Sequence, residues 1–321
     1  MSKNKTFKDL VDNDPAVKLD RILTKIDNCY KMERELSLIK HHIASNTLTN
    51  ELYKFLDENQ EMRELFKDIE VLDTSSMSQE ALDEYKLVRM RACDAAIEGI
   101  ISKINAFIVS LWHAFLDWLD DWFDDNKRLH FRLKQHLRHI TDDPMDYGSD
   151  QQFNELVGFC YIYKTEWIPM KDAIEALSKL FETVSSNDPY NWLKSNVSKL
   201  TANFAELGYE VTDTTIRYDN PKYVRNERAF GTSGAGWSKP IFMSAITKTI
   251  NMLEIERGSR QAFLSIRRTF DKVVRAEASD EDKKAMVKLV RGCKAIKTSA
   301  SIISRTVCDI GNRALAAYSK H

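Results

Sequence analysis

The segment from Ser78 to Ile140 contains no proline and a single glycine, Gly99. Its apolar residues recur every three or four positions, which is the period of an amphipathic helix. The segment therefore predicts a long helix with one face buried against other structure. A continuous helix of this length would measure roughly 95 Å at 1.5 Å per residue. Because ordinary helices are much shorter, we expect a break at the polar residues 124–126.

The apolar face of this segment is dense in aromatic rings. The rings are those of Phe107, Trp112, Phe115, Trp118, Trp122 and Phe123. Rings at helical spacing are most often core, so burial is the first interpretation. The second is a helix that docks onto a partner, and the residues assigned to that role are Phe107, Trp112, Phe115, Trp118 and Trp122.

Charge changes sign abruptly along the polar face of the same segment. Five aspartates between 117 and 125 are followed by five Lys and Arg residues between 127 and 138. Helices that lie on membrane surfaces carry Lys and Arg on their polar face, so aspartates at the aromatic end favour a protein partner over anionic lipid. The apolar run 106–116 is also shorter than the roughly 20 residues that a bilayer span requires. We therefore expect no transmembrane segment.

The composition fits a helix-rich globular protein. Hydrophobic residues make up 43% and charged residues 30%, with only 10 Gly and 6 Pro to force turns. The five cysteines are scattered without zinc spacing, which predicts buried free thiols in a reducing compartment. The N-terminus lacks the apolar stretch of a signal peptide. The fold class predicted is mainly α, a multi-helix assembly with one long Trp-rich helix and a small β-hairpin near 209–226.

Cap and turn residues divide the chain into regions. Predicted helix starts are Asn13 or Asp14 before Pro15, a capping box of Ser76 with Gln79, Asp188 before Pro189, and Ser279 or Asp280; Gly208 is a predicted stop. In the C-terminal part we expect helices at about 239–256, 259–277, 280–291 and 293–319. The regions are 1–72 (helical), 78–208 (helical, with the aromatic helix), 209–238 (hairpin and Gly/Ser loop) and 239–321 (basic and helical).

The C-terminal region differs in charge from the rest of the chain. From Pro240 onward there are 16 Lys+Arg and 8 Asp+Glu, against 31 and 40 before it. Two helix faces carry the excess, and their residues are Arg268, Lys272, Arg275, Lys284, Lys288 and Arg291. Such faces can neutralise phosphates without reading sequence, which gives a hypothesis of DNA contact. A solvated helix surface, or pairing with the acidic remainder of the chain, is the alternative.

Motifs for catalysis, metals or cofactors are not recognisable in the sequence. In the Gly-rich loop 231–239, Gly236 is followed by Trp237, and Lys239 is out of register for a phosphate-binding loop, so the loop predicts a connector. His136 and His139 are surrounded by Arg132, Lys134 and Arg138, which would repel a dication, so we expect a solvated basic face. We therefore expect no enzyme, no cofactor, no metal and no catalytic residue.

The aromatic stretch INAFIVSLWHAFLDWLDDWF, residues 104–123, resembles segments of internal structural proteins of large tailed (jumbo) bacteriophages. The resemblance extends over residues 80–140 and includes the setting in a long helical chain. It implies a virion protein, made in the bacterial cytoplasm, that is packed in the head with the genome or ejected with it. No functional residue carries over, because no site pattern defines such proteins.

The leading hypothesis is a non-enzymatic structural protein of a large phage particle. Its partners would be other virion proteins or copies of itself, with DNA contact through the basic C-terminal region. The alternative is a cytoplasmic helical binding or adaptor protein outside the particle. An enzyme comes third, because carboxylates distant in sequence could still meet in the fold.

Overall fold

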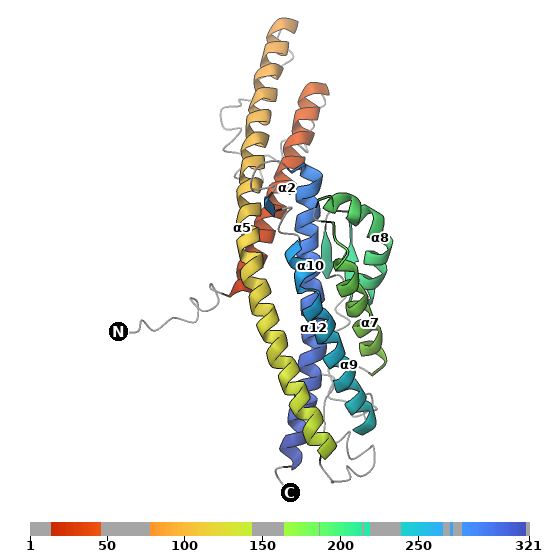
Figure 1. The fold of residues 1–321 in the computed structure, drawn as a ribbon. Helices are drawn as coiled ribbons and strands as arrows, with labels where there is room; N and C mark the ends of the chain where they lie inside the picture. The colour runs from red at the N-terminus through yellow and green to blue at the C-terminus, as the bar shows by residue number, and fades with distance from the viewer. Residues whose placement is uncertain are drawn as a thin grey trace, which may run out of the picture. The chain divides into compact units, whose positions relative to one another are not determined.

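The computed structural model describes residues 14–45, 78–142, 164–185, 187–213, 215–218, 239–265, 270–271 and 278–318. Helices dominate these residues, and their one sheet has two strands (Figure 1). The predicted mainly α fold is confirmed. The chain divides into two compact units, Met1–Ala114 and Phe115–His321, which are described separately.

Helix α5, Gln79–Asp142, is continuous over 64 residues and runs through both units. The break predicted at residues 124–126 was wrong. The side chain of Asn126 is buried and donates to Glu256, with Nδ2 and Oε2 2.7 Å apart, and Lys127 pairs with Asp124 at 3.0 Å. These polar side chains find partners without leaving helical geometry, so the helix passes through them.

Helix α5 begins with a different cap from the one predicted. The backbone N–H of Ala81 donates to the hydroxyl of Ser78 over 3.3 Å, so Ser78 supplies the cap oxygen. Ser76, the predicted cap, lies outside the described residues.

The first unit contains α2, Pro15–Ser45, and the part of α5 up to Ala114. Asp14 caps α2 as predicted, since its Oδ1 accepts from the N–H of Ala16 at 2.8 Å. Lys40, late in α2, pairs with Asp94, and Lys25, earlier in α2, lies 5.4 Å from the ring centre of Phe107. The two segments therefore run antiparallel, side by side (Figure 1). The sequence also predicts a second helix that begins at Thr47 or Thr49, and that segment lies outside the described residues.

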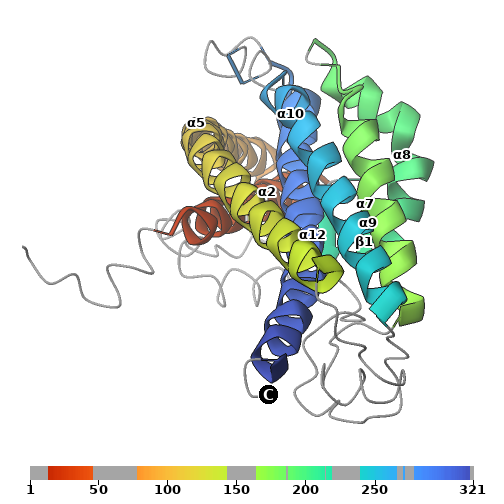
Figure 2. The same ribbon diagram turned by 60° about the horizontal axis from the view of Figure 1, so that its bottom comes forward.

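The second unit is built around its last helix. Its helices besides α5 are α7 (Lys164–Phe181), α8 (Pro189–Glu206), α9 (Lys239–Gly258), α10 (Arg260–Ser265) and α12 (Asp280–Tyr318). α12 packs against α7, α8 and α9, and Figure 2 shows these helices side by side. Side chains of α5 from Phe115 onward reach α9, α10 and α12. The core thus lies between α12 and the helices around it.

Helix α12 replaces two predicted helices, 280–291 and 293–319. The break predicted between residues 291 and 293 was wrong, because the helix continues through Gly292. A Cβ atom at Gly292 would lie 2.6 Å from Cζ of Phe181, so the glycine allows the α7 ring to approach α12 closely. The predicted cap at the start of the helix is confirmed, because the Ser279 hydroxyl accepts from the N–H of Asp282 at 3.1 Å.

The boundaries of α8 follow the predicted signals. Asp188 Oδ1 accepts from the N–H of Asn191 at 3.0 Å, and Pro189 occupies the first turn, where its missing N–H costs nothing. The helix ends at the cap residue Leu207, followed by Gly208 at φ 80°, a conformation that favours glycine.

The predicted hairpin is present in the described residues as strands β1, Tyr209–Val211, and β2, Ile216–Tyr218. They pair antiparallel, with Tyr209 opposite Tyr218. The connection is closed by a hydrogen bond from the N–H of Thr212 to the carbonyl of Thr215 over 2.9 Å. Residues 219–238, which include the rest of the predicted hairpin region and most of the Gly/Ser loop, lie outside the described residues.

Candidate functional site: polar and basic residues of α5

The aromatic face of α5 forms core in the second unit. Phe115, Trp118 and Trp122 are all buried. The ring centre of Trp122 lies 5.3 Å from that of Trp118 and 5.1 Å from that of Phe263 on α10. These three rings are covered by their own chain, which is the first of the two sequence-based interpretations, and they offer no surface to a partner.

Two of the rings assigned to partner docking belong to the first unit. Trp112 is buried, whereas Phe107 is half-buried and lies under the ammonium of Lys25. Among the described helices, α5 is long and apolar enough to span a bilayer by length and composition alone. The core helix of a soluble protein passes the same test, and 39% of the apolar stretch of α5 that meets it is buried.

A buried polar pair joins α5 to α9. Glu256 is 0% exposed and accepts the hydrogen bond from Asn126. Burial raises the pKa of Glu256 to about 8, while the Asn126 hydrogen bond and the charge of Lys297 act in the opposite direction. The carboxyl is therefore mostly protonated at neutral pH. An acid with this pKa suits proton transfer, but no solvent reaches it here.

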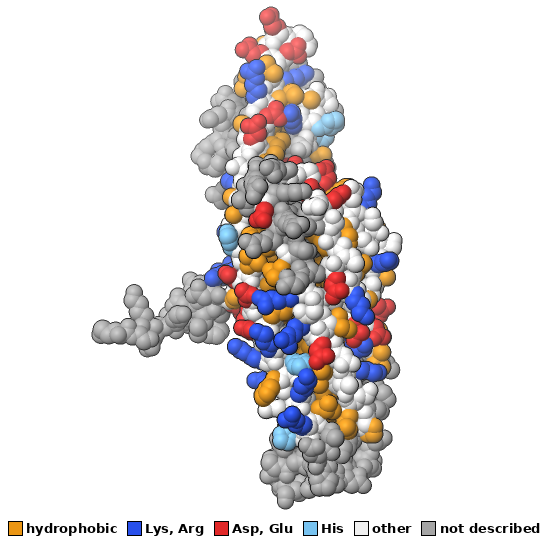
Figure 3. All heavy atoms as spheres, in the orientation of Figure 1, with side chains coloured by type: hydrophobic (Ala, Val, Ile, Leu, Met, Phe, Trp, Pro, Cys, Tyr) orange, Lys and Arg blue, Asp and Glu red, His pale blue; other side chains and the backbone are white. Residues whose placement is uncertain are grey.

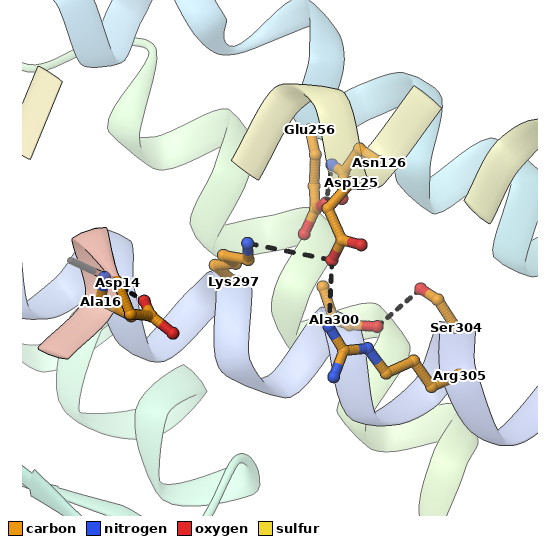
Figure 4. A network of polar contacts seen from close by, with 9 residues as sticks. All are labelled: Asp14, Ala16, Asp125, Asn126, Glu256, Lys297, Ala300, Ser304 and Arg305. Atoms are coloured by element: carbon orange, nitrogen blue, oxygen red, sulfur yellow. Dashed lines mark hydrogen bonds and ion pairs between the residues drawn. The ribbon is translucent and has the colours of Figure 1, made fainter. Parts of the chain in front are cut away.

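Next to this pair, Asp125 is held between two cations of α12 (Figure 4). Its Oδ2 lies 3.9 Å from Nζ of Lys297 and 3.3 Å from Nη2 of Arg305. Burial lowers the pKa of Lys297, and the charges of Asp125 and Asp121 oppose that effect. The ammonium also lies 5.9 Å from the ring centre of Trp118. Together these contacts fix α5 and α9 to α12.

Sequence reasoning missed this network, although a signal for it exists. Asn126 continues the three- and four-residue spacing of buried positions between Trp122 and Leu129 in α5. Glu256 does the same after Leu253 in α9. A polar residue at a position where the repeat requires an apolar one indicates a buried partner.

His136 occupies another such position. It was expected on a solvated basic face with His139, and the structure corrects this, since His136 is buried and His139 exposed. A Cβ atom at Gly311 would lie 2.7 Å from Cδ2 of His136, so α12 approaches the ring closely. Burial lowers the pKa of His136, and His139 and Arg132 lower it further. No group of three or more His, Cys, Asp or Glu within the described residues could hold a metal ion.

The exposed face of α5 after Asp125 is strongly basic. Lys127, Arg128, Arg132, Lys134 and Arg138 are all exposed there, and no acidic residue occurs between 127 and 140. Phe131 lies among them with 62% of its surface exposed. Figure 3 shows Lys and Arg side chains gathered over the lower part of α5. We name the residues Lys127, Arg128, Phe131, Arg132, Lys134 and Arg138 the basic face.

The six C-terminal cations predicted to contact nucleic acid are either outside the described residues or at least half-buried. Arg268, Lys272 and Arg275 lie outside the described residues. Lys288 is 4% exposed, and its ammonium donates to the carbonyl of Thr212 at 2.7 Å, so a phosphate cannot reach it without breaking that contact. Lys284 and Arg291 are half-buried and interact within the chain.

Four cysteines are free and buried, as expected: Cys29, Cys93, Cys293 and Cys308. Burial raises the pKa of the Cys308 thiol to about 12, so this group is inert as a nucleophile at neutral pH. Cys160 lies outside the described residues.

Comparison with known proteins gave no match: no family model, no curated protein and no solved structure is similar to this chain.

Proposed function

We propose that this chain is a non-enzymatic structural protein of a large bacteriophage virion, inside the head or ejected with the genome, that packs against other virion proteins or itself. The observation that carries the proposal is the continuous α5 of 64 residues. Its aromatic face stabilises its own fold, and its exposed face changes from acidic at residues 117–124 to basic at residues 127–138. Such a helix suits extended contact with a partner, and the resemblance of residues 80–140 to virion proteins supplies the setting.

The surroundings of Glu256, the carboxyl whose pKa is raised by burial to about 8, support a non-enzymatic role. Glu256 has the pKa of a general acid, yet it is enclosed in the core and bonded to Asn126. Its neighbours Asp125, Lys297 and Arg305 pair with one another across two helices. These groups join helices, and the carboxyl of Glu256 is closed to any substrate.

The test is the composition of purified particles. Quantitative mass spectrometry of gradient-purified virions, from the phage that encodes the chain, should find it in many copies per particle. The soluble fraction of the same infected cells serves as the control. A chain abundant in that fraction and absent from particles would refute the virion role.

The alternative, a cytoplasmic adaptor, is favoured by one observation in the first unit. Leu38 of α2 and Leu87 and Val88 of α5 are exposed by 53%, 48% and 59%. Exposed aliphatic residues of this size can form part of a protein-binding surface. In that case the chain should co-sediment with a host or viral protein complex, and Leu87→Ser with Val88→Ser should release it.

A further inference from the structure

Four residues of the basic face lie close together on one side of α5. At 100° per residue, Lys127, Phe131, Lys134 and Arg138 follow one line along the helix, and Arg128 and Arg132 lie roughly 90° and 130° around the helix from that line. From 127 to 138 the face extends about 16 Å along the axis. The rise per nucleotide of a stacked strand is about 3.4 Å, so the face covers about five phosphates.

The charge of this face is only partly neutralised within the chain. Lys127 pairs with Asp124, and Lys134 lies 3.7 Å from Glu254. Arg132 and Arg138 form no ion pair with a carboxylate among the described residues. Arg128 interacts with Asp124 only through its charge, which adds to the hydrogen bond from Lys127 in lowering the pKa of Asp124. Arginine that is exposed and unpaired is well suited to phosphate, because its planar group donates two parallel hydrogen bonds.

Neighbouring helices extend this positive charge on one side and limit it on the other. Arg305 of α12 is exposed and reaches α5 through Asp125. On the α9 side, Glu254 accepts from His130 at 2.9 Å, and that hydrogen bond is the main reason that the pKa of Glu254 is lowered. Toward the start of α5, the exposed aspartates 117, 120, 121 and 124 reverse the sign. A polyanion should therefore contact only the exposed face from Lys127 onward.

Phe131 adds an aromatic ring to the basic face, and binding of phosphates by charge alone does not require such a ring. Its ring is exposed in the middle of the cations, while the flanking residues Leu129 and Leu133 are buried. A single ring offers too little apolar area to insert into a membrane. It does offer a flat surface on which an unpaired base can stack, as aromatic side chains do in proteins that bind single strands.

We propose that the basic face of α5 binds single-stranded nucleic acid, with Arg128, Arg132 and Arg138 on phosphates of one strand and Phe131 stacked on a base. The proposed function names no nucleic-acid partner, and this inference supplies one. It rests on the proposed function for its biological setting only. The particle-composition test and the binding test below can therefore fail independently.

The experiment measures binding of the full chain to a fluorescent 20-nucleotide oligothymidylate by anisotropy, over a range of salt concentrations. Three to four phosphate contacts should give a slope of log K against log salt of about −2 to −3, at about −0.7 per contact. Replacing Arg128, Arg132 and Arg138 by Gln should weaken binding at least about tenfold and flatten the slope by about two. The matched control replaces Lys179, Lys194 and Lys199, exposed cations of α7 and α8, by Gln. It changes net charge equally and should bind within about twofold of the wild type.

Two further variants separate stacking and charge from loss of folding. Phe131→Ala should weaken binding to the single strand at least about fivefold and leave binding to a duplex of the same length unchanged. Asp117→Asn with Asp121→Asn should tighten binding, because both remove repulsion beside the basic face. A gain of affinity cannot arise from unfolding.

Several results would overturn the proposal. They are no binding at low salt, equal losses in the two triple variants, or no effect of Phe131→Ala on the single strand. Tighter binding to duplex, to polyglutamate, or to vesicles with phosphatidylglycerol would assign the face to another partner and would overturn it equally.

Discussion

At the scale of single residues, Trp118 and Phe131 show how differently two aromatic side chains of the same helix are used. Trp118 is buried against Trp122 and under Lys297, whereas most of Phe131 is in solvent. Trp118→Ala should lower the free energy of unfolding by roughly 3–5 kcal/mol, as removal of a core ring does. Phe131→Ala should change it by less than about 0.5 kcal/mol. Chemical denaturation of both variants checks the pair, and equal effects would contradict the assignment of Trp118 to the core.

Glu256 makes the stability of the chain depend on pH. Its pKa in the fold, about 8, exceeds that of an unfolded glutamate, so its stabilising effect is complete below about pH 4.5. Above that pH the unfolded chain loses the proton first, and stability falls until the pH passes about 8. Between pH 5 and pH 8 the loss should be roughly 3–5 kcal/mol.

Glu256→Gln isolates this effect, because glutamine keeps the shape and carries no proton to lose. The variant should lack the decrease in stability between pH 5 and pH 8 that the wild type shows in denaturant titrations. Glu254→Gln, on the exposed side of the same helix, is the control and should keep it. A wild type whose stability rises steadily over this range, in parallel with both variants, would rule out a buried protonated Glu256.

At the scale of helices, glycines within α5 and α12 have opposite surroundings. A Cβ atom at Gly292 would clash with Phe181, whereas one at Gly99 would meet nothing within 4 Å. Alanine is the better helix former by about 0.5–1 kcal/mol, so Gly99→Ala should stabilise the chain by that amount. Gly292→Ala should destabilise it by about 1–3 kcal/mol, because the Phe181 ring must move. Thermal unfolding of the two variants should shift in opposite directions, and a gain at both sites would show that α7 and α12 are not closely packed.

At the scale of the whole molecule, buried thiols report on both units. Cys29 and Cys93 belong to the first unit, and Cys293 and Cys308 to the second. In the native chain these thiols should react with an alkylating reagent only as fast as their unit opens, because buried thiols are protonated and inaccessible. Mass spectrometry of labelled peptides over time should give one rate for each pair. Rapid labelling of Cys293 or Cys308 without denaturant would contradict a closed second unit.

The sequence by itself determined the helical fold and its local boundaries. Asp14, Asp188, Ser279 and Gly208 were recognised because a cap is a contact within one or two helical turns. The aromatic period of α5 likewise indicated a buried face. The resemblance of residues 80–140 to virion proteins implies a structural protein, and this expectation still awaits its test.

Only the tertiary structure decided what happens to polar and small residues inside the helices. Asn126 does not end α5 because Glu256, distant in sequence, accepts its hydrogen bond. Gly292 does not end α12 because Phe181 fills the space beside it. Lys288 does not belong to the predicted nucleic-acid surface, because its side chain is buried and its ammonium donates a hydrogen bond to the carbonyl of Thr212. In each case the deciding partner comes from another helix or from the hairpin turn, and no local pattern along the chain reveals it.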